Sequence, residues 1–170
     1  MRPLIAESVG SNPRWRTNIK TMVIQMNSKA KGDIGESYVL YEFIRRGIRV
    51  SIPFGDNARY DLVAEFNGKL NRIQVKYCDQ LTENDSVVLP CASSRNHTTN
   101  KRYTTYQNDV DYFAFYIPKW NTAILVPIEV IGNKKSFLVR KTLPKKDFTN
   151  VHLLSDYAFD KILDTTVASK

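Results

Sequence analysis

Residues 61–76, which read D-L-V-A-E-F-N-G-K-L-N-R-I-Q-V-K, constrain the fold more than any other part of the chain. Two strand-like runs flank Asn67-Gly68, the strongest short signal for a two-residue turn between antiparallel strands. Counted outward from that turn, the predicted pairs are Phe66 with Lys69, Glu65 with Leu70, Val63 with Arg72, and Asp61 with Gln74. The sequence therefore predicts a β-hairpin in a defined register.

Side chains along each strand alternate between two faces. One face of the predicted hairpin is apolar and is expected to pack on a core: Leu62, Ala64, Phe66, Ile73, Val75 and Tyr77. The other face carries Asp61, Val63, Glu65, Leu70, Arg72, Gln74 and Lys76. A carboxylate, an amide and an ammonium group thus meet at the open end of the hairpin. Apolar packing does not require that cluster, whereas a metal site that cleaves phosphodiesters does.

Composition narrows the class of protein. The chain has 170 residues, 42% of them hydrophobic, which predicts one folded domain. Its net charge of +8 points toward an anionic partner. No apolar run approaches the roughly 20 residues of a membrane span, and residues 2–25 lack the apolar region of a secretory signal. Two cysteines fit a reducing cytosol, so we expect a cytoplasmic protein without membrane contact.

The chain divides into two parts. Residues 1–25 hold scattered prolines, glycine and basic residues without periodicity, and are interpreted as an N-terminal extension outside the core. Residues 26–170 are interpreted as the single domain. Within it, residues 28–46 read as a helix that Ser28 could cap and that carries Glu36. Glu36 shares a stripe with apolar residues, which directs it toward the sheet; a solvated surface glutamate is the alternative.

Two glycines in this helix, Gly32 and Gly35, each cost about 1 kcal/mol relative to alanine, which fits a backbone that must approach something closely. The remaining elements are predicted from period-two patterns and turn residues: strands at 48–54, 86–92 and 136–139, a second hairpin of 112–117 with 122–131, and a helix at 159–163. The polar residues 93–108 are expected to form a loop that runs into a short helix.

Candidate phosphate and base contacts lie outside the first hairpin. Basic groups and histidine interleave with tyrosines in the polar stretch, which suits nucleic acid but also an ordinary solvated loop. A basic region begins at residue 134 and could line a groove along a nucleic-acid backbone. The residues that we predict to contact DNA are Arg59, Arg95, His97, Lys101, Arg102, Lys134 and Lys135.

The cluster at the open end of the hairpin suits a hard cation such as Mg²⁺, which prefers oxygen ligands. Its predicted ligands are the Asp61 carboxylate, the Gln74 amide oxygen, the Val75 backbone carbonyl and the Glu36 carboxylate. Lys76 would lie beside the metal, orient or deprotonate water, and offset charge in the transition state. The predicted reaction is in-line hydrolysis that leaves 5′-phosphate and 3′-hydroxyl ends. The alternative is a surface ion pair between Asp61 and Lys76.

The ordered set of a glutamate-bearing helix, a strand, an aspartate strand and Gln74-Val75-Lys76 resembles the PD-(D/E)XK nuclease superfamily. Further segments resemble its cyanobacterial group I intron homing endonucleases: K-G-D-I-G-E-S-Y (31–38), N-A-R-Y-D-L-V (57–63), I-Q-V-K-Y (73–77) and the hairpin of 111–129. The resemblance implies an α/β fold with a restriction-endonuclease-like core, a mixed central sheet flanked by helices, and an added β-hairpin. It also implies catalytic roles for Glu36, Asp61, Gln74 and Lys76.

Gln74 departs from the usual acidic residue of the motif, which removes one negative charge from the metal site. The resemblance further implies a long double-stranded DNA target and a homo-oligomer. Because one active site cuts one strand, the oligomer is expected to be at least a dimer, and a tetramer is the other option. Two other functions stay open: a structure-specific nuclease that resolves Holliday junctions, and a basic DNA-binding module without catalysis.

Overall fold

A mixed five-stranded sheet in the order β1-β2-β3-β7-β8 forms the centre of the protein. The computed structural model describes residues 26–55, 57–82, 85–97, 100–144 and 149–164. Strands β3 and β7 run parallel, and the other neighbours in this sheet run antiparallel. Its strands are β1 (Arg49–Ser51), β2 (Leu62–Phe66), β3 (Lys69–Tyr77), β7 (Tyr112–Ile117) and β8 (Thr122–Pro127).

The structure confirms the hairpin of β2 and β3 in the predicted register. Asn67 and Gly68 both adopt positive φ, at 61° and 67°, as a two-residue turn of this handedness requires. Phe66 pairs with Lys69 and Val63 with Arg72. The apolar face is buried from Leu62 to Val75, while Tyr77 is half-buried.

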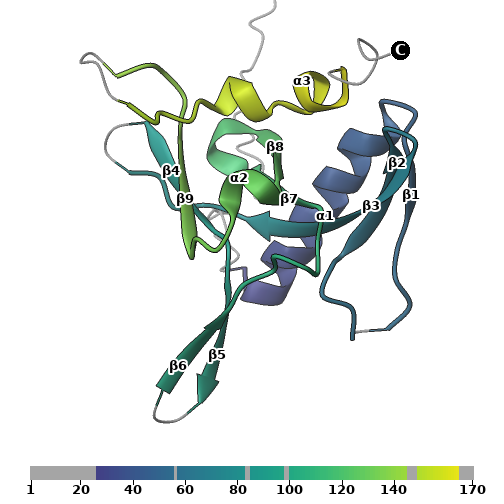
Figure 1. Ribbon diagram of the computed structural model, residues 1–170, viewed down its shortest axis with the longest axis horizontal. Coiled ribbons are helices and arrows are strands. Elements are labelled where there is room, and N and C mark those ends of the chain that lie inside the picture. Colours follow the sequence, from purple (N-terminus) through teal and green to yellow (C-terminus); the bar gives the residue numbers. More distant parts are fainter. Residues whose placement is uncertain (1–25, 56, 83–84, 98–99, 145–148, 165–170) are drawn as a thin grey trace, which may run out of the picture.

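Helix α1 (Ser28–Ile44) packs on one face of the sheet (Figure 1). It is capped by Asn27, not Ser28, because the Asn27 side chain accepts the backbone N–H of Ala30 at 2.8 Å. Gly35 confirms the expected close approach, since a Cβ there would lie 3.6 Å from side-chain atoms of Val75 and Tyr77. Gly32 has open space at the same position.

Other elements pack on both faces of the central sheet, and an apolar core lies on each face. Val39 and Phe43 of α1 pack with β2, β3 and Phe159 of α3 (Phe159–Asp164) on one side. On the other side, β7 and β8 pack against a two-stranded sheet of β4 (Ser86–Pro90) and β9 (Ser136–Arg140). Short helices complete the described elements: η1 (Pro118–Trp120), α2 (Ile128–Ile131) and η2 (Leu154–Tyr157). None of the described helices has the length and apolarity needed to cross a membrane.

Besides the Ser28 cap, three expectations from the sequence were wrong. The predicted loop and short helix at 93–108 are a hairpin of β5 (Ser93–His97) and β6 (Asn100–Thr104), which projects from the body of the molecule (Figure 1). Five cross-strand residue pairs join β5 to β6, and hydrogen bonding between their backbones favours strands although the polar composition suggested a loop. Residues 128–131 are the helix α2 rather than the end of a strand, and β1 is shorter than predicted. The extension at 1–25 lies outside the described residues.

Candidate active site

Asp61 is held at the start of β2 by the strand beside it. Its backbone N–H donates to the Ile73 carbonyl at 2.9 Å, which extends the hairpin ladder by one residue. Its carboxylate oxygen Oδ2 accepts the backbone N–H of Val75 at 2.6 Å and also the side-chain N–H of Gln74. The carboxylate is therefore fixed against β3 by two donors.

Gln74 links two of the predicted metal ligands. Its side chain is buried, with 7% exposed. Its amide nitrogen Nε2 donates to Asp61 and lies 3.3 Å from the Val75 carbonyl oxygen. The amide N–H group thus contacts both the carboxylate and the backbone carbonyl that were predicted to bind the cation.

The four predicted catalytic residues meet in one cleft of about 370 Å³. Glu36 reaches it from α1, Asp61 from the residue just before β2, and Gln74 and Lys76 from β3. Glu36 is half-buried on the side of α1 that faces this cleft, which agrees with the predicted direction toward the sheet. The residues that line the cleft are Ser28, Lys31, Gly32, Glu36, Asp61, Gln74, Val75, Lys76, Tyr77 and Asp79.

The two carboxyl groups have raised pKa values in this cleft. Burial is the main cause for Asp61, opposed by the Val75 N–H, the charge of Lys76 and the Gln74 amide. Burial also raises the pKa of Glu36, and the negative charge of Asp61 raises it further, while Lys76 lowers it. Two half-buried carboxylates that repel one another form a site that a cation stabilises.

The sequence analysis did not predict two residues that line the cleft, Lys31 and Asp79. Lys31 of α1 forms a 2.6 Å ion pair with Asp79, just beyond the end of β3, and its ammonium group lies 5.7 Å from the centre of the Tyr77 ring. The pair joins elements that are 48 positions apart. No local pattern signals such a contact, because only the docking of α1 on β3 brings the two residues together.

Lys76 shares an aromatic neighbour with Arg59. The Lys76 ammonium group lies 5.4 Å from the centre of the Tyr106 ring, and the Arg59 guanidinium group lies 4.6 Å from it. Arg59 also donates to the Thr105 carbonyl at 3.2 Å and pairs with Asp109 at 3.2 Å. Tyr106 is only 6% exposed, so it supports these cations and is not an open platform for bases.

The predicted DNA contacts occupy three places. Arg59 lines a second cavity of about 320 Å³ that shares Gln74 with the cleft. Lys134 and Lys135 are exposed between α2 and β9 and do not line the cleft. The other four belong to the projecting hairpin, and their side chains lie outside the described part of the structure: Arg95, His97, Lys101 and Arg102.

The donor set of the cleft fits a hard divalent cation. Two carboxylates and one backbone carbonyl supply oxygen atoms, which Mg²⁺ prefers, whereas the Gln74 amide presents its N–H group to two of them. Within the described residues, no group of three or more histidine, cysteine or acidic side chains is placed to hold a metal. A cation in this cleft would therefore need neutral oxygen donors beside Asp61 and Glu36.

The fold and the cleft together define a class of protein, and comparison with known proteins agrees. The PD-(D/E)XK endonuclease family matches residues 26–160, which is most of the chain. The chain belongs to this family, and it is an endonuclease of the PD-(D/E)XK type with the expected α/β fold.

One solved structure has a similar fold. The bacterial homing endonuclease I-Ssp6803I superposes with a TM-score of 0.70 at 24% sequence identity, over 85% of this chain and 98% of that one. At that identity the likeness establishes a shared fold. Comparison with curated proteins gave no significant match.

Proposed function

We propose that this endonuclease is a Mg²⁺-dependent, sequence-specific enzyme that cleaves double-stranded DNA and serves intron homing. The observation that carries the proposal is the convergence of Glu36, Asp61, Gln74 and Lys76 on one cleft. Family membership supports cleavage of phosphodiesters in DNA. The fold shared with a bacterial homing endonuclease supports the choice of a site-specific target.

Asp61, Glu36 and the Val75 carbonyl would hold the cation, and Gln74 would join them after a half-turn of its amide that presents oxygen instead of nitrogen. When bound, Mg²⁺ polarises the scissile phosphate and lowers the pKa of water. Lys76 orients the attacking water and offsets the negative charge that develops on phosphorus. Water attacks in line, the bond from phosphorus to the 3′ oxygen breaks, and 5′-phosphate and 3′-hydroxyl ends remain.

Target recognition is proposed to use the hairpin of β5 and β6. A two-stranded ribbon fits the major groove of B-DNA, where base pairs can be distinguished. The register pairs Arg95 with Arg102 and Asn96 with Lys101, which concentrates basic residues on this ribbon. Arg59, His97, Lys134 and Lys135 are the other proposed contacts. One cleft cuts one strand, so a double-strand break requires at least two protomers.

Plasmid cleavage tests the proposed chemistry. Wild-type protein should nick and linearise DNA that carries the target with Mg²⁺, and EDTA should stop it. Lys76→Ala and Asp61→Asn should each lose at least about a hundredfold in rate while DNA binding persists. Lys69→Ala is the matched control, because Lys69 is an exposed lysine on the same strand. Equal cleavage by all four proteins would refute the role of this cleft.

A competition experiment tests the substrate. Linear DNA that carries the target and four-way junctions of unrelated sequence are offered together. Preferential cleavage of the linear target supports sequence specificity. Preferential cleavage of junctions would instead assign the same chemistry to junction resolution, and tight binding without cleavage of either would favour the binding module.

A further inference from the structure

The loop between β1 and β2 leaves two large apolar side chains in solvent. Ile52 is 69% exposed, and Phe54 is fully exposed. Neither belongs to the two apolar cores formed by the described residues, although Ile48 and Val50 just before them pack on the core on the α1 side of the sheet. Loop tips are usually built from small and polar residues, so two large apolar groups here indicate a surface made for contact.

The backbone of this wedge loop, residues 52–55, is restricted. Pro53 fixes its own φ and also confines Ile52 to extended conformations. Gly55 follows at a φ of 80°, which residues with side chains rarely adopt. The turn therefore presents Phe54 with limited freedom, and less conformational entropy is lost when the loop binds a partner.

The wedge loop begins beside the catalytic cleft. The last residue pair of β1 with β2 joins Ser51 to Val63. Asp61 precedes Val63 by two residues, so its Cα atom lies within about 7 Å of that pair. Phe54 follows Ser51 by three residues, which limits its distance to about 11 Å. In Figure 1 the loop extends toward the same side of the molecule as the hairpin of β5 and β6 and the N-terminal turns of α1, which line the cleft.

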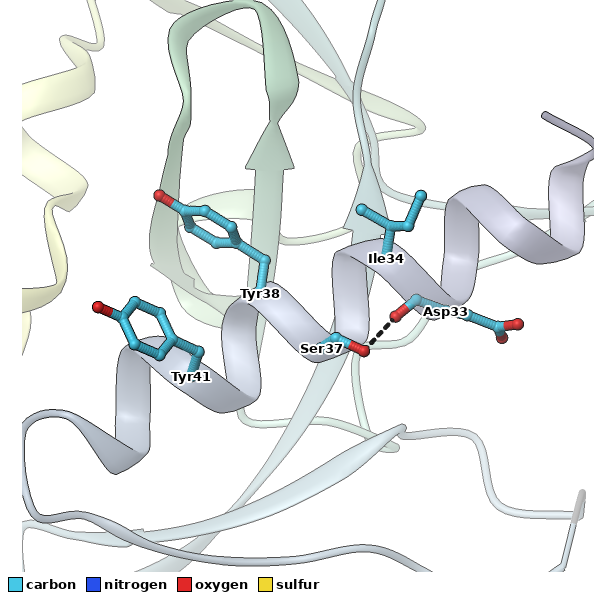
Figure 2. A pocket seen from close by; sticks show the side chains of 5 residues that line it. All are labelled: Asp33, Ile34, Ser37, Tyr38 and Tyr41. Carbon is cyan, nitrogen blue, oxygen red and sulfur yellow. Dashed lines mark hydrogen bonds between the residues drawn. The ribbon is translucent and has the colours of Figure 1, made fainter. Parts of the chain in front are cut away.

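Other exposed apolar side chains occupy a different surface. Tyr41 is 58% exposed, and Figure 2 shows it on the outside of α1, where it lines a shallow groove of about 410 Å³. None of the residues that line this groove lines the catalytic cleft. The groove also contains the acidic Asp33 and no basic residue, which does not suit DNA. The wedge loop, in contrast, starts next to the catalytic Asp61.

Charge and position identify duplex DNA as the partner of the wedge loop. Basic residues flank it on both sides: Arg49 in β1, whose side chain is 87% exposed, and the half-buried Arg59. Phosphates border a groove of the duplex, and base steps form its floor, so an apolar tip between basic groups matches a groove. A duplex whose phosphate enters the cleft of this endonuclease passes within reach of the loop.

We propose that Ile52 and Phe54 form an apolar wedge that enters the minor groove of the DNA target beside the scissile phosphate and partly unstacks one base step. The proposal rests on the proposed nuclease function, because the duplex must lie in the same cleft. The β5–β6 hairpin is proposed for the major groove, and apolar wedges of other proteins insert from the minor groove. Pyrimidine–purine steps unstack most easily, so the wedge selects a TA or CA step within about three base pairs of the cut.

Fluorescence of 2-aminopurine tests the wedge. The probe is a duplex selected by binding from a randomised library, with 2-aminopurine at one step at a time and Ca²⁺ in place of Mg²⁺. Wild-type protein should raise the fluorescence several-fold at one step near the cut, because unstacking relieves quenching. Phe54→Ala should leave the fluorescence at the level of the free duplex and weaken DNA binding about tenfold or more. Leu70→Ala is the matched control, because Leu70 is 71% exposed on β3 and outside the cleft.

Two further measurements guard against an indirect effect. Phe54 is fully exposed, so Phe54→Ala should leave the Tm of the free protein unchanged, and Phe54→Leu, which keeps an apolar tip, should retain most of the fluorescence increase. Replacing the selected step by a stiffer AA step should weaken wild-type binding about tenfold and should barely affect Phe54→Ala.

The outcomes distinguish the wedge from the nuclease function. A local fluorescence increase in a protein that fails to cut the same duplex with Mg²⁺ supports the wedge and refutes the proposed cleavage. Cleavage without a local increase, or an equal increase with Phe54→Ala, overturns the wedge. Altered sedimentation of free Phe54→Ala protein with unchanged DNA signals assigns the loop to contact between protein chains, which also overturns it. A protein that binds no duplex overturns both proposals.

Discussion

Replacing the proposed central metal ligand, Asp61→Asn, should make the metal-free protein more stable at pH 7. The environment of Asp61 raises its pKa, chiefly through burial, so the folded chain favours the neutral carboxyl. Asparagine resembles that neutral form. It also removes the negative charge that raises the pKa of Glu36. The asparagine oxygen can still accept the Val75 N–H, so the fixed geometry is largely kept.

The size of the gain follows from linkage. Each unit by which folding raises a carboxyl pKa costs about 1.4 kcal/mol of unfolding free energy at neutral pH. The lost charge-assisted hydrogen bonds offset part of the relief, which leaves a net gain on the order of 1 kcal/mol. For a domain of this size, that gain corresponds to a Tm higher by about 2–4 °C.

The pH dependence has a definite sign. A carboxyl with a raised pKa contributes its full stability below the unfolded pKa and loses it as pH rises through the folded pKa. The advantage of Asp61→Asn should therefore be largest at pH 7 and vanish near pH 3, below the ordinary pKa of aspartate.

Thermal unfolding in EDTA, followed by circular dichroism from pH 3 to pH 7, measures this difference. Glu65→Gln is the matched control, since it neutralises an exposed carboxylate further along the chain, in β2. Added Mg²⁺ at ten times its Kd should raise the wild-type unfolding free energy by about 1.4 kcal/mol and leave Asp61→Asn nearly unchanged. A variant less stable than wild type at pH 7, or a difference independent of pH, would refute the reasoning.

Three further predictions concern the residues around the cleft. Gln74→Glu adds a third carboxylate to the cleft, so it should lower the unfolding free energy of the metal-free protein. It should also tighten Ca²⁺ binding about tenfold, measured by calorimetry. An unchanged Ca²⁺ affinity would place Gln74 outside the metal site. The Cβ of Gly35→Ala fits the available space, so this variant should raise the unfolding free energy in urea by up to about 1 kcal/mol. Gly35→Leu should lower it by about 1–3 kcal/mol, because the larger side chain overpacks Val75. Equal effects of the two variants would contradict the close approach of α1 to β3. Tyr106→Leu removes the aromatic ring beside Lys76 and should slow DNA nicking about tenfold, whereas Tyr106→Phe keeps the ring and should leave the rate unchanged. Equal nicking rates for the two variants would show that the ring does not position Lys76.

Much of the cleft could be predicted because its main contributors lie on one hairpin. Asp61 and Gln74 face each other once Asn67-Gly68 defines the turn, and both residues adopt the positive φ that this turn needs. The motif order then indicated the helix that supplies Glu36. The proposed roles of these residues in catalysis and metal binding stay predictions.

Local pattern determined the elements whose backbone conformation depends on neighbours in sequence: α1, the hairpin of β2 and β3, and the strands β4, β7 and β9. Only the tertiary structure decided the contacts that depend on docking. Strand β3 pairs in parallel with β7, which is distant in sequence, and the packing of α1 on β3 brings Lys31 to Asp79. Polar residues in β5 and β6 became strands because pairing satisfies their backbone groups, a gain that side-chain composition does not display. Short-range turn and helix preferences are present in the sequence itself, whereas burial and ion pairing arise only when distant segments meet.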